Sequence, residues 1–266
     1  MPGDEGSCLV RNQSVSKPLF LLLLLTLISA GAQQPANDLS SAASRGDKAA
    51  LQQLMIRAER GDPNAQYYLG LMYEAGEGVD KDATQAVRWY RQSADQNLAD
   101  AQFKLGDIHA RGQDYTQAVQ WYRRAADQGH AFSQLYLGIM YRRGQGVPKD
   151  SVQAALWLRR AADQRLSGAQ YYLGLMYEQG EGVAKDEMQA AKWYRLAAEQ
   201  GLAAAQNALG WMNGEGKGVP RDFITAYVWL NLAATQGDET AKRNRDIVGK
   251  QMTAEQIAEA QRRSRQ

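Results

Sequence analysis

Apolar residues recur along most of this chain at steps of three and four residues, which is the spacing of one face of an α-helix. From residue 62 onward such a face carries Ala65, Leu69 and Met72. After a short glycine-rich break a second face follows, with Ala86 and Trp89. The pattern predicts two helices joined by a tight turn into an antiparallel hairpin.

The hairpin pattern occurs five times, and each copy contains a Leu-Gly pair that follows an Ala-Gln or Ser-Gln element. The pairs are Leu69-Gly70, Leu105-Gly106, Leu137-Gly138, Leu173-Gly174 and Leu209-Gly210. Successive pairs are 36 residues apart, except for 32 between the second and third. The predicted repeats therefore cover about residues 62–97, 98–129, 130–165, 166–201 and 202–237. A fixed period of this length is typical of a solenoid, in which stacked units bury the faces that one unit leaves open.

The residues around the turn have predictable roles. Gly-x-Gly-Val ends the first helix, because glycine adopts left-handed dihedral angles at little cost. An aspartate such as Asp150 or Asp186 then begins the second helix as its N-cap, with Gln at capping-box spacing. The Gly of each Leu-Gly pair lies inside a helix, where it indicates that another helix approaches closely. The second repeat is four residues short and lacks the Gly-Val part of the turn.

The repeated residues closely resemble the Sel-1-like repeat, a relative of the tetratricopeptide repeat. The resemblance implies an all-α fold: a right-handed α-solenoid of five helix-turn-helix repeats with capping helices at both ends. It also implies a scaffold that holds a protein or peptide partner on its concave face. The alternative is a cell-envelope hydrolase, because cysteine-rich members of the family have been described as β-lactamase-like or penicillin-binding. Those members carry paired cysteines in each repeat, which this chain lacks, so we expect no enzyme and no catalytic residue.

The regions outside the repeats have their own patterns. Residues 1–32 combine basic residues, an apolar run and small residues up to Ala32, which predicts a secretory signal peptide cleaved near Ala32 and a periplasmic or secreted protein. No second long apolar run follows, so we expect no transmembrane segment after cleavage. Residues 33–46 are interpreted as a flexible lead, 47–61 as an N-terminal capping helix and 238–266 as C-terminal capping helices.

Composition excludes several kinds of site. The net charge is +2, without the basic stripe that nucleic-acid binding needs. The single cysteine, Cys8, lies within the predicted signal peptide, and the two histidines, His109 and His130, fall in different repeats. We therefore expect no metal, no cofactor and no disulfide in the processed chain, which we expect to be monomeric.

The candidate binding positions lie two residues before and two residues after each repeated Leu. One row is Tyr67, Phe103, Leu135, Tyr171 and Asn207, and the other is Leu71, Asp107, Ile139, Leu175 and Trp211. From these we select eight as a protein-binding surface: Tyr67, Leu71, Phe103, Asp107, Ile139, Tyr171, Leu175 and Trp211. The alternative is that the first row packs between adjacent hairpins. Trp211 is of special interest because it falls outside the register of the other tryptophans, which we assign to the core.

Overall fold

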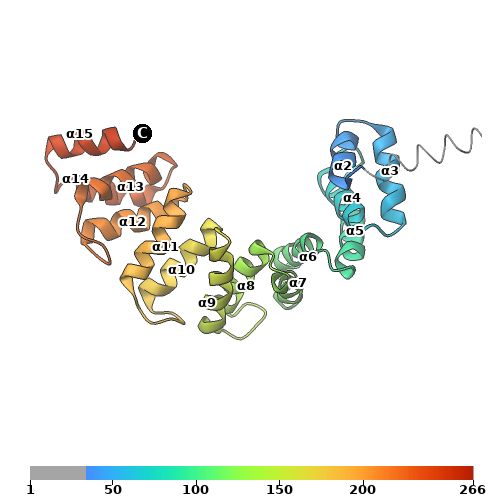
Figure 1. Ribbon diagram of the computed structural model, residues 1–266, viewed down its shortest axis with the longest axis horizontal. Helices are drawn as coiled ribbons and strands as arrows, with labels where there is room; N and C mark the ends of the chain where they lie inside the picture. The colour runs from blue at the N-terminus through green and yellow to red at the C-terminus, as the bar shows by residue number, and fades with distance from the viewer. Residues whose placement is uncertain (1–33, 266) are drawn as a thin grey trace, which may run out of the picture. The chain divides into compact units, whose positions relative to one another are not determined.

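The computed structural model describes residues 34–265, so the predicted signal peptide lies outside the described residues. Within that range the protein is all-α, with fourteen helices and no strand. Figure 1 labels these helices along the chain. The helices divide into two compact units, one ending at Ala86 and the other beginning at Val87, within α5. None of the described helices is both long enough and apolar enough to cross a bilayer.

The first unit contains α2 (Ala36–Ser44), α3 (Lys48–Glu59), α4 (Pro63–Ala75) and the first residues of α5 (Ala83–Asp95). The expectation of a flexible lead at 33–46 was wrong, because α2 occupies most of that segment and buries Ala36, Leu39 and Ala43. These three apolar residues have helical spacing, but the polar residues between them obscured the pattern. Helix α3 begins at Asp47, whose side chain accepts hydrogen bonds from the backbone N–H groups of Ala49 and Ala50.

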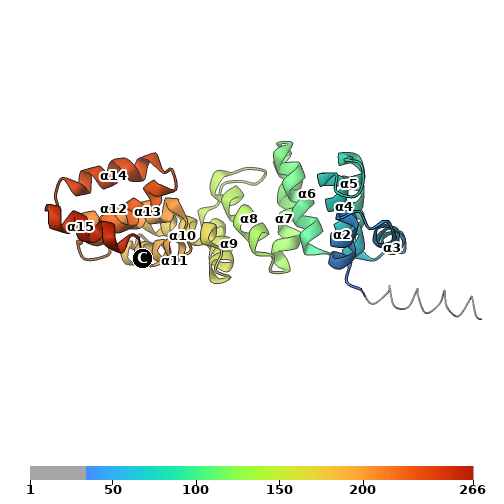
Figure 2. The ribbon, with the colours of Figure 1, turned by 90° about the horizontal axis from the view of Figure 1, so that it is seen from above.

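The second unit stacks four helical hairpins in chain order (Figure 2). They are α6 (Ala99–Arg111) with α7 (Tyr115–Asp127), α8 (Ala131–Arg143) with α9 (Ser151–Asp163), α10 (Ser167–Gln179) with α11 (Glu187–Glu199), and α12 (Ala203–Glu215) with α13 (Phe223–Thr235). Helices α14 (Glu239–Gly249) and α15 (Ala254–Arg263) close the chain. Asp114, Asp150, Asp186 and Asp222 are N-caps of the second helices, as the sequence predicts. Thr253 and Gln256 form a complete capping box at α15.

The glycine of each Leu-Gly pair allows the two helices of a hairpin to touch. A Cβ atom on Gly174 would lie 2.7 Å from the ring of Tyr194, and one on Gly210 would lie 2.7 Å from Leu230. Both neighbours are fully buried. The predicted close approach is therefore confirmed, and the facing side chain is a large one.

The buried glutamine of each Ala-Gln or Ser-Gln element links consecutive hairpins. The amide of Gln170 donates to the carbonyl oxygen of Ala162 at 3.2 Å and accepts from Nε2 of Gln200 at 2.7 Å. Ala162 lies near the end of α9 in the preceding hairpin, and Gln200 follows α11, the second helix of the hairpin that contains Gln170. Equivalent paired bonds are made by Gln102, Gln134 and Gln206. A row of side-chain amides therefore gives a second donor to a buried carbonyl near the end of each second helix, which also accepts a backbone N–H.

The repeated tryptophans are core residues. Trp89, Trp121, Trp157 and Trp193 are buried, which confirms the assignment for these four, whereas Trp229 is only partly buried and packs against the core of α11 and α12. Arginine guanidinium groups lie over several of the rings, such as Arg124 over Trp121 at 4.5 Å. The indole N–H groups of Trp89, Trp121 and Trp193 make no hydrogen bond, so these rings contribute through their apolar area.

Candidate functional site

The eight predicted binding residues are all partly buried. Tyr67 and Leu71 lie on α4 in the first unit, and the other six lie on the first helices of the second unit. Tyr171 and Leu175 pack against a core formed by α11 and α12, and Ile139 packs against the core of α9 and α10. Leu135, in the first row, is buried within that core. The rows therefore serve largely to join hairpins, and the eight selected residues keep part of their side chains exposed.

The most open aromatic surface lies on α6 and α8, around Phe103. Phe132 is 49% exposed and Tyr136 is 39% exposed, although both are large aromatic residues. The ring centroid of Phe103 lies 6.0 Å from that of each, and Tyr136 stacks on buried Tyr122 at 5.5 Å. We call Phe103, Tyr122, His130, Phe132 and Tyr136 the aromatic cluster. It is a rigid, partly exposed platform of the kind that anchors protein interfaces.

Sequence reasoning included Phe103 but missed Phe132 and Tyr136. The position of Phe132 is occupied in the other repeats by Asn64, Asp100, Gly168 and Ala204, which are all small or polar. A large aromatic residue at this position departs from the repeat pattern, and its side chain is not buried in the core. This departure from the repeat pattern could have identified Phe132 as a binding residue. Phe132 lies directly after the shortened second repeat.

His130 supports this surface by beginning α8. Its Nδ1 accepts a hydrogen bond from the backbone N–H of Ser133 at 3.2 Å, and its ring lies 4.9 Å from that of Phe103. Burial lowers the pKa of His130 below its ordinary 6.5, although Asp100, 3.4 Å from Nε2, opposes the shift. The neutral form is the one that can accept the cap bond at Nδ1. His130 therefore has a structural role, and its charge state is coupled to the start of α8.

Asp107 places a carboxylate beside the aromatic cluster. Its carboxylate pairs with Arg111 at 2.9 Å, one turn along α6. Burial raises the pKa of the Tyr122 hydroxyl, with the charge of Asp107 acting in the same direction. The predicted residue Asp107 thus lies at the edge of the aromatic cluster, to which Phe103 belongs.

A second group of aromatic residues surrounds Tyr171. Its ring lies 5.7 Å from that of Tyr194, whose hydroxyl donates to Oε2 of Glu178 at 2.6 Å. Burial raises the pKa of both tyrosines. Arg142 lies over the neighbouring ring of Tyr172 at 6.0 Å. These contacts join α8, α10 and α11, so Tyr171 stabilises the stack as well as offering an edge to a partner.

Trp211 lines a pocket of about 250 Å³ between α12, the start of α13 and α14. The other lining residues are Gly214, Glu215, Arg221, Phe223, Ile247, Val248 and Gln251. Ile247 is exposed, and the guanidinium of Arg221 lies over Phe223 at 5.8 Å. The predicted position of Trp211 at an open surface therefore has a pocket of mixed apolar and polar lining beside it. Residues of α14 form one wall of this pocket.

In the part of the chain that the structure describes, no three His, Cys, Asp or Glu side chains come together in a way that could hold a metal ion. The surfaces described above are apolar and aromatic with a few charges at their edges. Such surfaces suit binding of another chain rather than acid–base or nucleophilic chemistry.

Comparison with known families agrees with the fold. The Sel1 repeat model matches residues 63–98, 99–130, 131–166, 167–202 and 203–238. The chain belongs to the Sel1-repeat family. Each match begins one residue after the start predicted from the Leu-Gly pairs. The fold class predicted from the sequence, an all-α solenoid of five Sel1 repeats, is confirmed.

Solved Sel1-repeat structures are similar over most of the chain. A Sel1 repeat protein from Oxalobacter formigenes is 35% identical, with a TM-score of 0.72, and the match covers 78% of this chain and 86% of that one. A protective antigen of uropathogenic Escherichia coli strains, with an SLR fold, is also 35% identical, with a TM-score of 0.57, covering 86% of this chain and 59% of that one.

One curated relative is a plant protein, the ERAD-associated E3 ubiquitin-protein ligase component HRD3A of Arabidopsis thaliana. It is 37% identical over 71 residues, which are 26% of this chain and 10% of the relative. The chain therefore spans only about a tenth of that relative's length. Sel1-repeat proteins generally serve as scaffolds for protein–protein interaction.

Proposed function

We propose that this protein is an exported adaptor whose Sel1 repeats hold a protein or peptide partner on the face formed by the first helices of the hairpins. The observation that carries the proposal is the exposure of Phe132 and Tyr136 over the aromatic cluster. Exposure of these apolar rings to water is unfavourable, and a partner that covers them would gain about 25 cal/mol for each Å² of apolar surface buried. Rigid aromatic side chains also lose little conformational entropy on binding.

The partner has a defined place to bind. It would cover Phe132 and Tyr136 and reach Phe103, while the Asp107–Arg111 pair at the edge offers charged groups for orientation. The Trp211 pocket lies on the same chain of repeats, four hairpin helices further along. An extended or helical peptide with two apolar anchors fits this arrangement.

The test is photocrosslinking in the native cell with a photoreactive amino acid at position 136. Position 120 is the matched control, because Gln120 is exposed on the second helix of the preceding hairpin. We expect position 136 to crosslink to a discrete partner that position 120 does not capture. The purified partner should then bind Phe132→Ala/Tyr136→Ala at least tenfold more weakly than the wild-type protein. Equal binding by both proteins, with the variant correctly folded, would reject the aromatic cluster as the site.

Export rests on the sequence of residues 1–32 and is tested separately. Mass spectrometry of the protein isolated from cell fractions should find a mature N-terminus near Gln33 in the periplasmic or extracellular fraction. A full-length chain confined to the cytoplasm would contradict this part of the proposal and leave partner binding unaffected.

A further inference from the structure

The second helices carry an apolar surface on the opposite side from their core residues. On α9 this surface consists of Val152, 57% exposed, and Leu156, 51% exposed. On α11 it consists of Met188, 70% exposed, and Leu196. We call these four residues the outer apolar surface. In both helices they lie at steps of four or eight residues, so each helix presents them as one stripe.

The stripes lie at equivalent positions of consecutive repeats. Met188 is 36 residues after Val152, and Ile224 is 36 residues after Met188. The position of Leu156 is occupied by Lys192 on α11 and by Val228 on α13, and Leu232 is 36 residues after Leu196. The face therefore continues from α9 through α11 to α13, with the same register.

On α13 the chain covers this face itself. Ile224 and Val228 pack in one cluster with Ile257 and Ala260 of α15, and both are only partly exposed. Asn231 also donates to Oγ of Ser264, which follows α15, at 3.1 Å. Helix α15 is amphipathic, with its apolar residues directed to α13. The structure thus shows what kind of element fits this face: an amphipathic helix.

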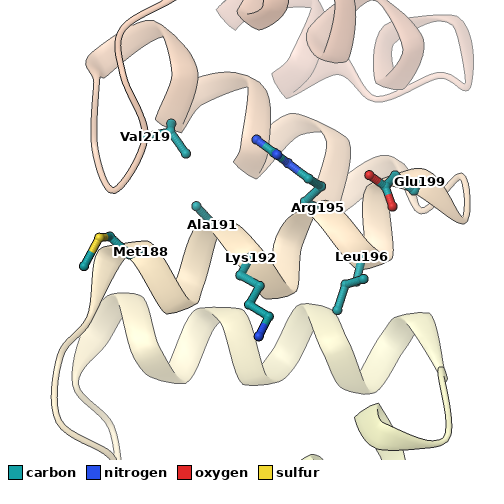
Figure 3. A pocket seen from close by; sticks show the side chains of 7 residues that line it. All are labelled: Met188, Ala191, Lys192, Arg195, Leu196, Glu199 and Val219. Atoms are coloured by element: carbon teal, nitrogen blue, oxygen red, sulfur yellow. The ribbon is translucent and has the colours of Figure 1, made fainter.

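On α11 the uncovered face is hollowed. Met188, Ala191, Lys192, Arg195, Leu196 and Glu199 line a groove of about 270 Å³ that is bounded by Val219 from the turn before α13. Figure 3 shows Lys192 and Leu196 projecting from one side of α11 and Arg195 from the other. Lys192 therefore lies within the stripe, between Met188 and Leu196, while Arg195 lies beside it, and Arg160 on α9 takes the position of Leu196. Glu199 is the one carboxylate among the lining residues. Neither Lys192 nor Arg195 forms an ion pair within residues 34–265.

We propose that the outer apolar surface of α9 and α11 is a second docking site, which binds an amphipathic helix of a partner protein whose apolar stripe is flanked by carboxylates. The partner helix occupies the face that α15 occupies on α13. Its carboxylates meet Lys192 and Arg195, and its apolar residues cover Met188, Leu156 and Val152. This site is separate from the aromatic cluster, which lies on first helices, and it stands whether or not that cluster binds a partner.

The test uses two synthetic helical peptides that share one leucine stripe and differ only in their flanking residues, which are glutamate in one and lysine in the other. We expect the wild-type protein to bind the glutamate-flanked peptide at least tenfold more tightly in fluorescence anisotropy. Met188→Glu/Leu156→Glu should lose that binding at least tenfold, with an unchanged melting temperature because both side chains are exposed. Phe132→Ala/Tyr136→Ala is the matched control and should bind the peptide as the wild type does.

Charge reversal completes the test. Lys192→Glu/Arg195→Glu should reverse the preference, so that the lysine-flanked peptide binds more tightly. The proposal is overturned if the glutamate-flanked peptide does not bind the wild-type protein, if Met188→Glu/Leu156→Glu binds it equally well, or if both peptides bind alike. Loss of peptide binding in Phe132→Ala/Tyr136→Ala alone would assign the peptide to the aromatic cluster instead.

Discussion

The α-carbon of Gly182 lies so close to the carbonyl of Ser151 that a Cβ atom there would be 2.0 Å from the carbonyl oxygen. Ser151 is the first residue of α9, and Gly182 belongs to the turn of the next hairpin. Gly146 and Gly218 make the equivalent approach to Tyr115 and Glu187. The second glycine of each turn therefore sets the spacing between consecutive repeats, in addition to adopting a positive φ.

We expect Gly182→Ala to destabilise the protein far more than Gly201→Ala. Both glycines have positive φ, +70° and +86°, but no atom lies within 4 Å of a Cβ on Gly201. Strain alone should cost Gly201→Ala roughly 1–2 kcal/mol. The backbone collision should add about 1–3 kcal/mol for Gly182→Ala. Urea denaturation of the two variants measures the difference, and equal losses would show that the turns can separate freely.

Replacement of Gln170 by leucine should cost about 0.5–1.5 kcal/mol, because it removes a buried hydrogen bond to the carbonyl oxygen of Ala162, which keeps only the backbone N–H of Arg165 as a donor. Gln200 would also lose the acceptor of its 2.7 Å hydrogen bond. Gln120→Leu is the control, since that exposed residue should change stability by less than about 0.5 kcal/mol. The free energy of unfolding of each variant decides the question. A neutral Gln170→Leu would mean that the amide row adds nothing to stacking.

The stability of the protein should depend on pH through His130. Its pKa is lower in the folded state, so the unfolded state binds more protons as the pH falls through 6.5. The contribution of His130 is therefore fully present above pH 6.5 and is lost as the pH falls through its folded pKa. His130→Asn keeps an N-cap that does not titrate. Melting temperatures between pH 7.5 and 5 should fall more steeply for the wild type than for this variant, and parallel curves would contradict the prediction.

Trp211→Ala and Tyr171→Ala, at two of the eight predicted binding residues, should differ in their effects on stability. Tyr171 packs against the core of α11 and α12, so its loss should cost about 2 kcal/mol. Trp211 lines an open pocket, and its loss should cost less than about 1 kcal/mol while weakening the binding of the partner. Thermal unfolding and partner affinity, measured for each single variant, test this. A larger loss of stability for Trp211→Ala would place that ring in the core.

Much of this architecture could be predicted because the same residues recur at the same positions in each repeat. The helices and the buried tryptophans follow from apolar residues at helical spacing. The turns and the Asp caps follow from residue types that are strongly preferred at those positions. Helix α2 was missed because its three buried apolar residues lie among polar ones. The candidate site was predicted only in part. The Leu-based register found Phe103, Asp107 and Trp211 but could not show that Phe132 and Tyr136 stay exposed.

The sequence by itself determined the repeat unit, its helices and the class of scaffold, because propensity, capping and apolar periodicity act within a few turns of the chain. The tertiary structure decided what no local pattern contains. It paired Gln170 with Gln200 across a hairpin, placed Gly182 against Ser151 and directed α15 to the outer face of α13. It also decided which copies of that face are covered and which are left open. These outcomes depend on how far each hairpin lies from the next, and that distance is set by side chains that meet only when the repeats stack.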